Sequence, residues 1–242
     1  LQFTFLPIAF ASVANIKEPV KIGSYLTPGL INMDGTGIFN KLNDAIFMEM
    51  SKNSELTITS LNRARIGVKN GDLDSYFPEL RENLLGQEDQ YVVSRPIFYK
   101  RIILFTLNGS GLTELSDFEN ETLGVVRGFS YGKEIISNPQ LNLIFQSNDI
   151  INIKLLLNKR IDGVLGGYPG TVKAVKENNG ASKIHYDLNR PVAILESFYV
   201  CKNDPVGVKL CHSIDKAIQS LLRKGMLELN ETTGFSRFNS ID

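Results

Sequence analysis

The sequence contains few of the residues that build metal centres and histidine-based active sites. Its 242 residues include two cysteines, Cys201 and Cys211, and two histidines, His185 and His212. A four-ligand zinc site needs more such ligands at closer spacing. Two histidines so far apart in sequence also give weak support for acid/base chemistry. We therefore predict no metal, no cofactor and no catalytic residue, and we interpret both histidines as surface or helix residues.

The chain has no excess of charge of either sign. The 26 Lys and Arg residues balance 26 Asp and Glu residues, and no run of basic residues forms a stripe. A protein that binds nucleic acid needs such a basic surface to meet the phosphates. With 43% hydrophobic and 21% charged residues, the composition is that of a folded globular protein. We expect a monomer whose partner is a small molecule rather than a nucleic acid.

Long apolar runs are also missing, apart from the beginning of the chain. Residues 1–14 carry no charge and end in two small-x-small triplets, Ala9-Phe10-Ala11 and Ser12-Val13-Ala14. This pattern is typical of the end of a signal peptide, and it is too short to span a bilayer. The alternative is an apolar first strand that packs on the domain. We predict an exported, periplasmic protein that is soluble once residues 1–14 are removed.

The state of the two cysteines stays open from the sequence. In an oxidising compartment Cys201 and Cys211 can pair, which would close a short loop between a strand and the helix that follows it. Two buried free thiols fit the sequence equally well.

The first part of the chain alternates short apolar strands with amphipathic helices, which is typical of an α/β fold with parallel strands. Asn62 is a candidate helix cap, and Asn70-Gly71 supplies a left-handed stop. The expected strands cover 20–26, 55–61 and 73–77, and the expected helices cover 38–50 and 63–69.

The same alternation restarts in the second half. The expected strands cover 122–127, 143–146 and 161–165, and the expected helices cover 130–137, 149–159 and 171–177. Two long apolar segments, 91–107 and 192–200, separate this unit from the rest and are interpreted as crossings. A long helix over 205–222, followed by a short helix after Gly225, would return to the first unit.

This pattern predicts an α/β protein of two lobes joined by two hinge crossings. Lobe one would contain residues 20–101 and 198–242, lobe two would contain residues 106–192, and the hinges would lie near 102–105 and 193–197. A single doubly wound sheet would give a similar alternation. In the two-lobe arrangement, strand ends and helix N-termini from both lobes surround one cleft, where ligands of α/β sheets bind.

Five local patterns, taken in order, resemble the extracellular solute-binding proteins of family 3. They are Asp34-Gly35-Thr36-Gly37 before a helix, Asn62-Arg63-Ala64 with Asn70-Gly71-Asp72-Leu73-Asp74, Ser94-Arg95-Pro96-Ile97-Phe98-Tyr99, Leu123-Gly124-Val125-Val126-Arg127-Gly128-Phe129-Ser130-Tyr131-Gly132, and Leu157-Asn158-Lys159-Arg160-Ile161-Asp162-Gly163-Val164. The resemblance covers about residues 20–234 and departs at Lys159, where the family pattern has Gly.

The resemblance implies a type II periplasmic-binding-protein fold that closes on a small polar solute, anionic or zwitterionic. It also implies delivery of that solute to the permease of an ABC transporter. Two alternatives are a periplasmic sensing module that feeds a membrane receptor or kinase, and a cleft enzyme such as a dehydratase. We found no paired His and carboxylate or nucleophile motif in the sequence, and we therefore interpret the chain as a binding protein and not an enzyme.

The candidate ligand residues fall into three groups, each with a structural alternative. Three arginines are candidates for a ligand carboxylate, and each could instead form an ion pair on lobe one. Residues at the predicted start of a helix could meet an anionic group, although Ser130 could simply cap that helix. Three rings could sandwich an organic ligand, with core packing as the competing role, above all for Phe77. The groups are Arg63, Arg81 and Arg95; Arg127, Ser130 and Tyr131; and Tyr25, Phe77 and Tyr168.

Two departures bear on the ligand. The spacing from Asp74 to Arg81 is shorter than the usual family arrangement, so Arg81 could lie on a solvated loop. Where similar amino-acid binders place an acidic residue to hold the ligand ammonium, this chain has Gly167. The sequence therefore gives no strong argument for an ordinary α-amino acid.

Overall fold

A computed structural model describes residues 18–27 and 30–239. The expected signal-peptide remnant at residues 1–14 lies outside this part. Within the described residues, none of the helices combines the length and apolar character needed to cross a membrane.

Lobe one is built on three parallel strands, with β1 (Val20–Tyr25) between β2 (Ser54–Thr59) and β3 (Ser75–Leu80). Helix α1 (Ile38–Glu49) and the long helix α6 (Pro205–Arg223) bury one apolar core, and α2 (Leu61–Asn70) covers a second. The alternation of apolar residues in the sequence correctly predicted these elements.

The ends of the helices in lobe one follow from individual residues. The N-cap of α2 is Ser60, whose hydroxyl oxygen accepts a hydrogen bond from the backbone amide of Arg63. The prediction of Asn62 as the cap was therefore wrong. Gly71 ends the helix at φ +87°, as expected for a left-handed stop. Asp204 caps α6 through the amides of Val206 and Gly207.

Lobe two repeats the pattern, with β6 (Thr122–Val126) pairing in parallel with β7 (Asn142–Gln146) and β8 (Gly163–Gly167). Helices α4 (Asp149–Leu157) and α5 (Gly170–Glu177) pack on one face, and Asn148 caps α4. On the other face, the core includes Ile135 of α3 (Lys133–Ile136), a helix that is much shorter than the predicted helix 130–137.

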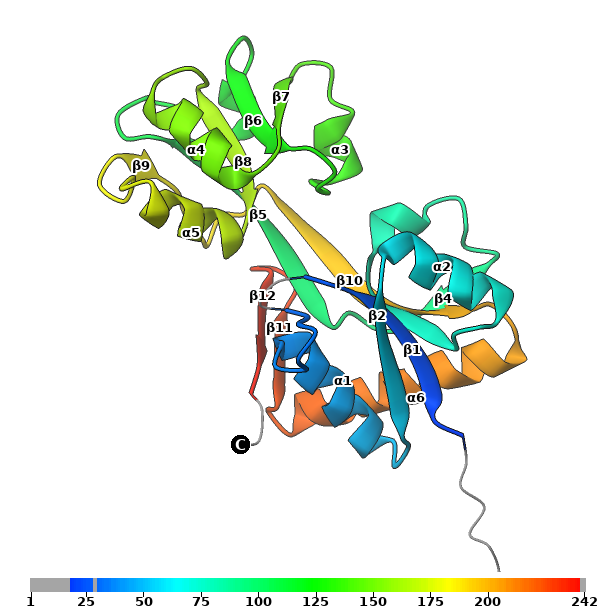
Figure 1. Ribbon diagram of the computed structural model, residues 1–242. Coiled ribbons are helices and arrows are strands. Elements are labelled where there is room, and N and C mark those ends of the chain that lie inside the picture. Colours follow the sequence, from blue (N-terminus) through cyan, green and yellow to red (C-terminus); the bar gives the residue numbers. More distant parts are fainter. Residues whose placement is uncertain (1–17, 28–29, 240–242) are drawn as a thin grey trace, which may run out of the picture.

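Two long antiparallel strands, β5 (Phe98–Leu107) and β10 (Ala193–Lys202), join the lobes (Figure 1). Their pairing runs from Phe98↔Ser197 to Ile102↔Ala193. The eight long strands form one continuous sheet in the order β2-β1-β3-β10-β5-β8-β6-β7. The two-lobed α/β fold is confirmed, because separate apolar cores lie at the two ends of these strands.

Shorter elements complete the chain, and both histidines are exposed, as predicted. His185 lies in β9, and His212 lies on α6. The segment after Gly225 is a hairpin and not the expected short helix, and Ser236 in it accepts the amide of Tyr99 on β5. The remaining bounds are η1 (Arg81–Leu84), β4 (Tyr91–Val93), η2 (Leu115–Asp117), β9 (Ile184–His185), β11 (Leu227–Asn230) and β12 (Phe235–Phe238).

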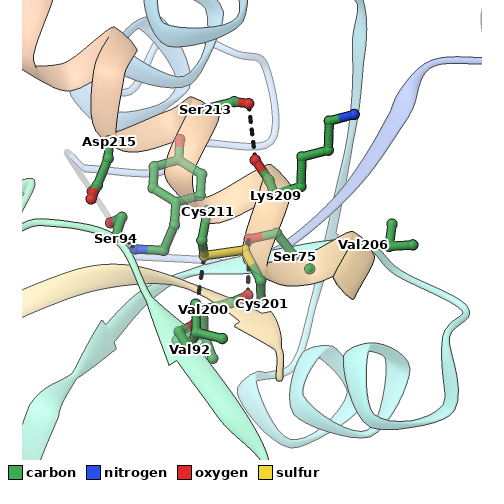
Figure 2. Close-up of a disulfide and its surroundings, with 12 residues drawn as sticks. Ser75, Val92, Ser94, Val200, Cys201, Val206, Lys209, Cys211, Ser213 and Asp215 are labelled. Carbon is green, nitrogen blue, oxygen red and sulfur yellow. Dashed lines mark hydrogen bonds between the residues drawn. A yellow bond between two sulfur atoms is a disulfide. The ribbon is translucent and has the colours of Figure 1, made fainter. Parts of the chain in front are cut away.

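Cys201 and Cys211 form a disulfide between β10 and α6, which settles the alternatives left by the sequence (Figure 2). Both residues are buried in the core of lobe one. Nearby, the hydroxyl of Ser75 donates to the carbonyl of Val200 at 2.9 Å. The disulfide therefore fixes the lobe-one end of the connecting strand β10 to the long helix α6.

Removing this disulfide should destabilise the protein. It closes a loop with a sequence separation of 10 residues, for which lost chain entropy in the unfolded state predicts about 3 kcal/mol. The melting temperature should fall by roughly 6 to 12 °C in reductant or in the Cys201→Ser/Cys211→Ser variant. Thermal denaturation measures this. The double variant should not respond to reductant, and an unchanged melting point with both thiols titrated would contradict the expectation.

Candidate functional site

Lys100 on β5 lies where the two lobes meet. Its ammonium group donates a hydrogen bond of 2.8 Å to the backbone carbonyl of Ser130, in the loop between β6 and α3. The ring centroids of Phe129 and Tyr131 lie 5.4 and 5.7 Å from Nζ, a distance at which an aromatic face attracts a cation. A lysine of one connecting strand is thus held against a loop of lobe two.

The surroundings of Lys100 leave its charge incompletely compensated. Burial lowers the pKa of Lys100 to about 8, while Glu82 of η1 and Asp149 of α4 act in the opposite direction. In the part of the chain described here, neither carboxylate comes within the 4.0 Å of an ion pair with Lys100. One acidic residue from each lobe therefore faces the same ammonium group at a distance.

Asp149 has an unused acceptor next to this lysine. Its Oδ1 is buried and has no hydrogen-bond partner among the described residues. Burial raises the pKa of the Asp149 carboxyl, opposed by a hydrogen bond from Thr171 on α5 and by the charge of Lys100. A carboxylate oxygen in this position can accept a hydrogen from a ligand.

Two glycines leave room beside these charged groups. A Cβ on Gly167 would lie 3.4 Å from Cε of Lys100, and a Cβ on Gly170 would lie 3.9 Å from Oδ2 of Asp149. Gly167 is the position at which the sequence lacks the acidic residue of similar amino-acid binders. The structure brings a carboxylate to this neighbourhood from another element, the first residue of α4.

The three predicted arginines lie in different surroundings. Arg81 is 58% exposed; its Nε donates to Glu196 at 2.8 Å, and its guanidinium lies 4.4 Å from the ring centroid of Phe198. The backbone amide of Arg95 donates to Asp215 of α6, and its guanidinium lies 3.9 Å from the same carboxylate. Arg63 is exposed on the first turn of α2. Of the three, we keep Arg81 in the candidate site, because η1 also carries Glu82.

Burial corrects two of the predicted ligand contacts, the ring of Phe77 and the residue Tyr131 at the predicted helix start. Phe77 is 0% exposed and stacks on Tyr199 at 4.2 Å in the core of lobe one, so it cannot touch a ligand in this structure. Tyr131 is 1% exposed, and its hydroxyl accepts the amide of Val126 at 2.7 Å. Both rings fill cores because they lie at positions where the sheet is covered.

The other predicted residues occupy strand ends. Tyr25 is half-buried, and burial, followed by the charge of Glu79, raises its pKa to about 12. Tyr168 lies under the guanidinium of Arg101 at 4.4 Å. Arg127 is exposed. Ser130 does not cap α3, whose N-cap is Gly132, and it meets Lys100 through its carbonyl oxygen.

The structure thus brings Ser130 and Tyr131 together with residues that the sequence reasoning missed. Those residues are Lys100, Asp149, Glu82 and Phe129, of which Phe129 is 53% exposed. Signals for two of them were present: Lys100 is a charged residue inside a long apolar segment, and Asp149 follows a strand at a helix start. Two surface hollows lie elsewhere in lobe two, one lined by residues 106–113 and His185, the other by residues 110–112, 116, 117 and 119–121.

The fold of the chain can be compared with known proteins. No protein-family model and no curated protein sequence matches the chain. Solved structures do match, among them three that are 15 or 16% identical to this chain. The unliganded open L-cystine solute receptor of Neisseria gonorrhoeae is 16% identical with a TM-score of 0.66, and the match covers 86% of this chain and 88% of that one.

Two further solved structures have a similar fold. The ligand-binding core of GluR0 from Nostoc punctiforme, in complex with L-glutamate, is 16% identical with a TM-score of 0.61, covering 86% of this chain and 94% of that one. A histidine kinase sensor domain with similarity to periplasmic binding proteins is 15% identical with a TM-score of 0.63, covering 88% and 93%. At these identities the likeness establishes the fold alone.

The burial of Lys100 has a measurable effect on stability against pH. Because the folded pKa of about 8 lies below the ordinary 10.5, the unfolded chain binds more protons between these values, and stability rises with pH across that window. Relative to Lys100→Met, the wild type should gain up to about 3 kcal/mol between pH 8 and pH 10.5. Urea denaturation at several pH values measures the difference, and two parallel curves would refute it.

Proposed function

We propose that this chain, which has the type II periplasmic-binding-protein fold, holds a small anionic or zwitterionic solute between its two lobes. The main support for the proposal comes from Lys100 and Asp149, two residues of opposite charge at the junction of the lobes. They do not form an ion pair with each other. The site needs no catalytic group, and we propose binding rather than catalysis.

A solute would supply the partners that these two residues lack. A buried charge without a close counter-charge is costly, and a buried acceptor without a donor adds a smaller desolvation penalty. A ligand carboxylate beside Lys100 would form a charge-assisted hydrogen bond, and an N–H or O–H group of the ligand would satisfy Oδ1 of Asp149. The exposed ring of Phe129 can cover an apolar part of the same solute.

The connecting strands suit a hinge that closes on this solute. We propose that lobe one contains residues 20–101 and 198–242, that lobe two contains residues 106–192, and that bending occurs near 102–105 and 193–197. Glu82 and Asp149 approach Lys100 from opposite lobes. Closure would therefore bring fixed polar groups from both sides onto one guest, in the manner of two-domain binding proteins.

Delivery to a membrane permease is the role that we favour, and the similarity in fold to a solute receptor supports it. The disulfide suits an oxidising compartment outside the cytoplasm, in agreement with export. Sensing is the second candidate, because a kinase sensor domain has the same fold. Deleting the gene should abolish uptake of the bound solute if the role is transport, whereas a lost transcriptional response with normal uptake would favour sensing.

Solute binding should appear as thermal stabilisation. In a screen of amino acids, organic acids, polyamines and small peptides, at least one class should raise the melting temperature by about 5 to 11 °C at concentrations near 100 times Kd. Lys100→Met should abolish that shift. The exposed Lys183→Met is the matched control and should keep it. No stabilisation by any class, or an equal shift in Lys100→Met, would contradict the proposal.

Arg81 can be tested in the same screen. If its guanidinium holds the ligand carboxylate, Arg81→Ala should reduce the shift and leave the unliganded melting point nearly unchanged, because its pair with Glu196 is exposed. Equal stabilisation in Arg81→Ala would remove Arg81 from the site and leave Lys100 as the group that meets the anion.

The affinity for an acidic solute should depend on the protonation of Lys100. Because the charged form binds the anion and the pKa is about 8, affinity should be greatest below pH 8 and fall roughly tenfold per pH unit above it. Calorimetric titration with the solute from the screen measures this. Lys100→Arg, which stays charged, should bind with little dependence on pH in this range. A steep fall in both proteins would assign the titration to another group.

A further inference from the structure

Glu79 is a buried carboxylate whose two oxygens bind different parts of lobe one. It is 1% exposed and lies near the end of β3. Oε2 accepts from Nε and Nη2 of Arg65 on α2, at 2.7 and 2.6 Å, and from the hydroxyl of Tyr76 at 2.9 Å. Oε1 accepts from the amide of Leu80 at 2.9 Å and from Nδ2 of Asn83 at 2.8 Å. Every donor is within hydrogen-bonding distance.

The two oxygens therefore have separate roles. Oε2 binds Arg65 and Tyr76, which belong to the packed body of lobe one, where Tyr76 is fully buried. Oε1 binds Leu80, which precedes η1, and Asn83, which is inside η1. Through this one carboxylate, the short helix η1 is tied to the body of the lobe.

The helix that is held in this way carries two residues that face the connecting strands. Arg81 donates to Glu196 on β10, and Glu82 acts on Lys100 of β5. A helix of one turn has little intrinsic stability, so its position depends on side-chain bonds of this kind. Leu84 of η1 is 7% exposed and packs in the core that α2 covers, so this packing and the Glu79 bonds together hold the helix.

We infer that Glu79 is a positioning residue for the ligand site: by holding η1 through Oε1, it keeps Glu82 opposite Lys100 and Arg81 beside Glu196. This inference rests on the proposed binding function for its purpose. Glu79 itself cannot meet a solute in this structure, since both of its oxygens are occupied and it is buried. The competing role is an ion pair with Arg65 that stabilises lobe one and has no effect on the site.

Asn83→Ala separates the two roles. Removing Glu79 would leave Arg65 and Tyr76 without their partner and could unfold the lobe, whereas Asn83→Ala removes a single bond between η1 and Oε1 and leaves the pair with Arg65 intact. The matched control is Asn108→Ala, which also removes one hydrogen bond donated by a side-chain amide, here to the backbone carbonyl of Ser182, at a place in lobe two that has no link to η1.

The readout is the titration of Lys100, followed by NMR of the protein with ¹³C-labelled lysine. Glu82→Gln removes the carboxylate that holds the pKa of Lys100 up, so it should lower that pKa and set the full size of the effect. Asn83→Ala should lower the pKa by part of that amount, because η1 is released. Asn108→Ala should leave it unchanged, and all three variants should remain folded by circular dichroism.

Two results would overturn the inference. In the first, Lys100 titrates as in the wild type in Asn83→Ala while Glu82→Gln shifts it, which shows that η1 keeps its place without the Glu79 bond. In the second, Glu82→Gln has no effect, which shows that Glu82 does not act on Lys100. Because the titration uses the protein without any solute, its failure is distinct from a failure to find a stabilising solute in the screen.

Discussion

The ammonium group of Lys100 is the constraint on which the site depends. It has one short hydrogen bond to a neutral carbonyl, two aromatic faces and two carboxylates at a distance. An ammonium in such surroundings is less well compensated than in water, which is why its pKa falls. The strand that carries it connects the lobes, so a solute that compensated Lys100 would also contact the strand at which we propose that the lobes bend. In this proposal, binding and closure are linked through one charge.

The contrast between two buried carboxylates shows which polar groups serve the fold and which are available to a ligand. Glu79 is surrounded by five donor atoms and has no free acceptor, so it stabilises lobe one and orders η1. Asp149 keeps one buried oxygen without a partner. Buried polar groups in folded proteins are normally satisfied by hydrogen bonds. A solute would therefore gain the most binding free energy by bonding to this unsatisfied oxygen and to the ammonium group, which lacks an ion-pair partner.

Local patterns in the sequence predicted most of the fold, and the misses have local causes. Alternating apolar residues located the strands and long helices, and the segments 91–107 and 192–200 contain the two connecting strands. The helix expected at 130–137 is short because Gly132 takes φ +95°, a left-handed conformation outside the helical region. The candidate site was predicted less well. Phe77 was assigned by its place at a strand end and Tyr131 by its place at a predicted helix start, but burial depends on how the elements pack in three dimensions. Only the tertiary fold brings Asp149 close enough to Lys100 to act on its charge.

The disulfide and the Glu79 bonds both lie in lobe one, and this asymmetry has a consequence for closure. Cys201–Cys211 fixes the lobe-one end of β10 to α6, and Glu79 fixes η1 to α2 and β3. In lobe one, Arg81 and Glu82 thus lie on a helix that is held in place by side-chain bonds. Lobe two meets Lys100 through a loop bounded by Gly128 and Gly132, both at positive φ, and through the first residue of α4. If one surface is fixed, we expect the energetic difference between the proposed open and closed states to lie mainly in the contacts that lobe two makes. The solute that best satisfies Asp149 and Lys100 together would then be the one that favours closure.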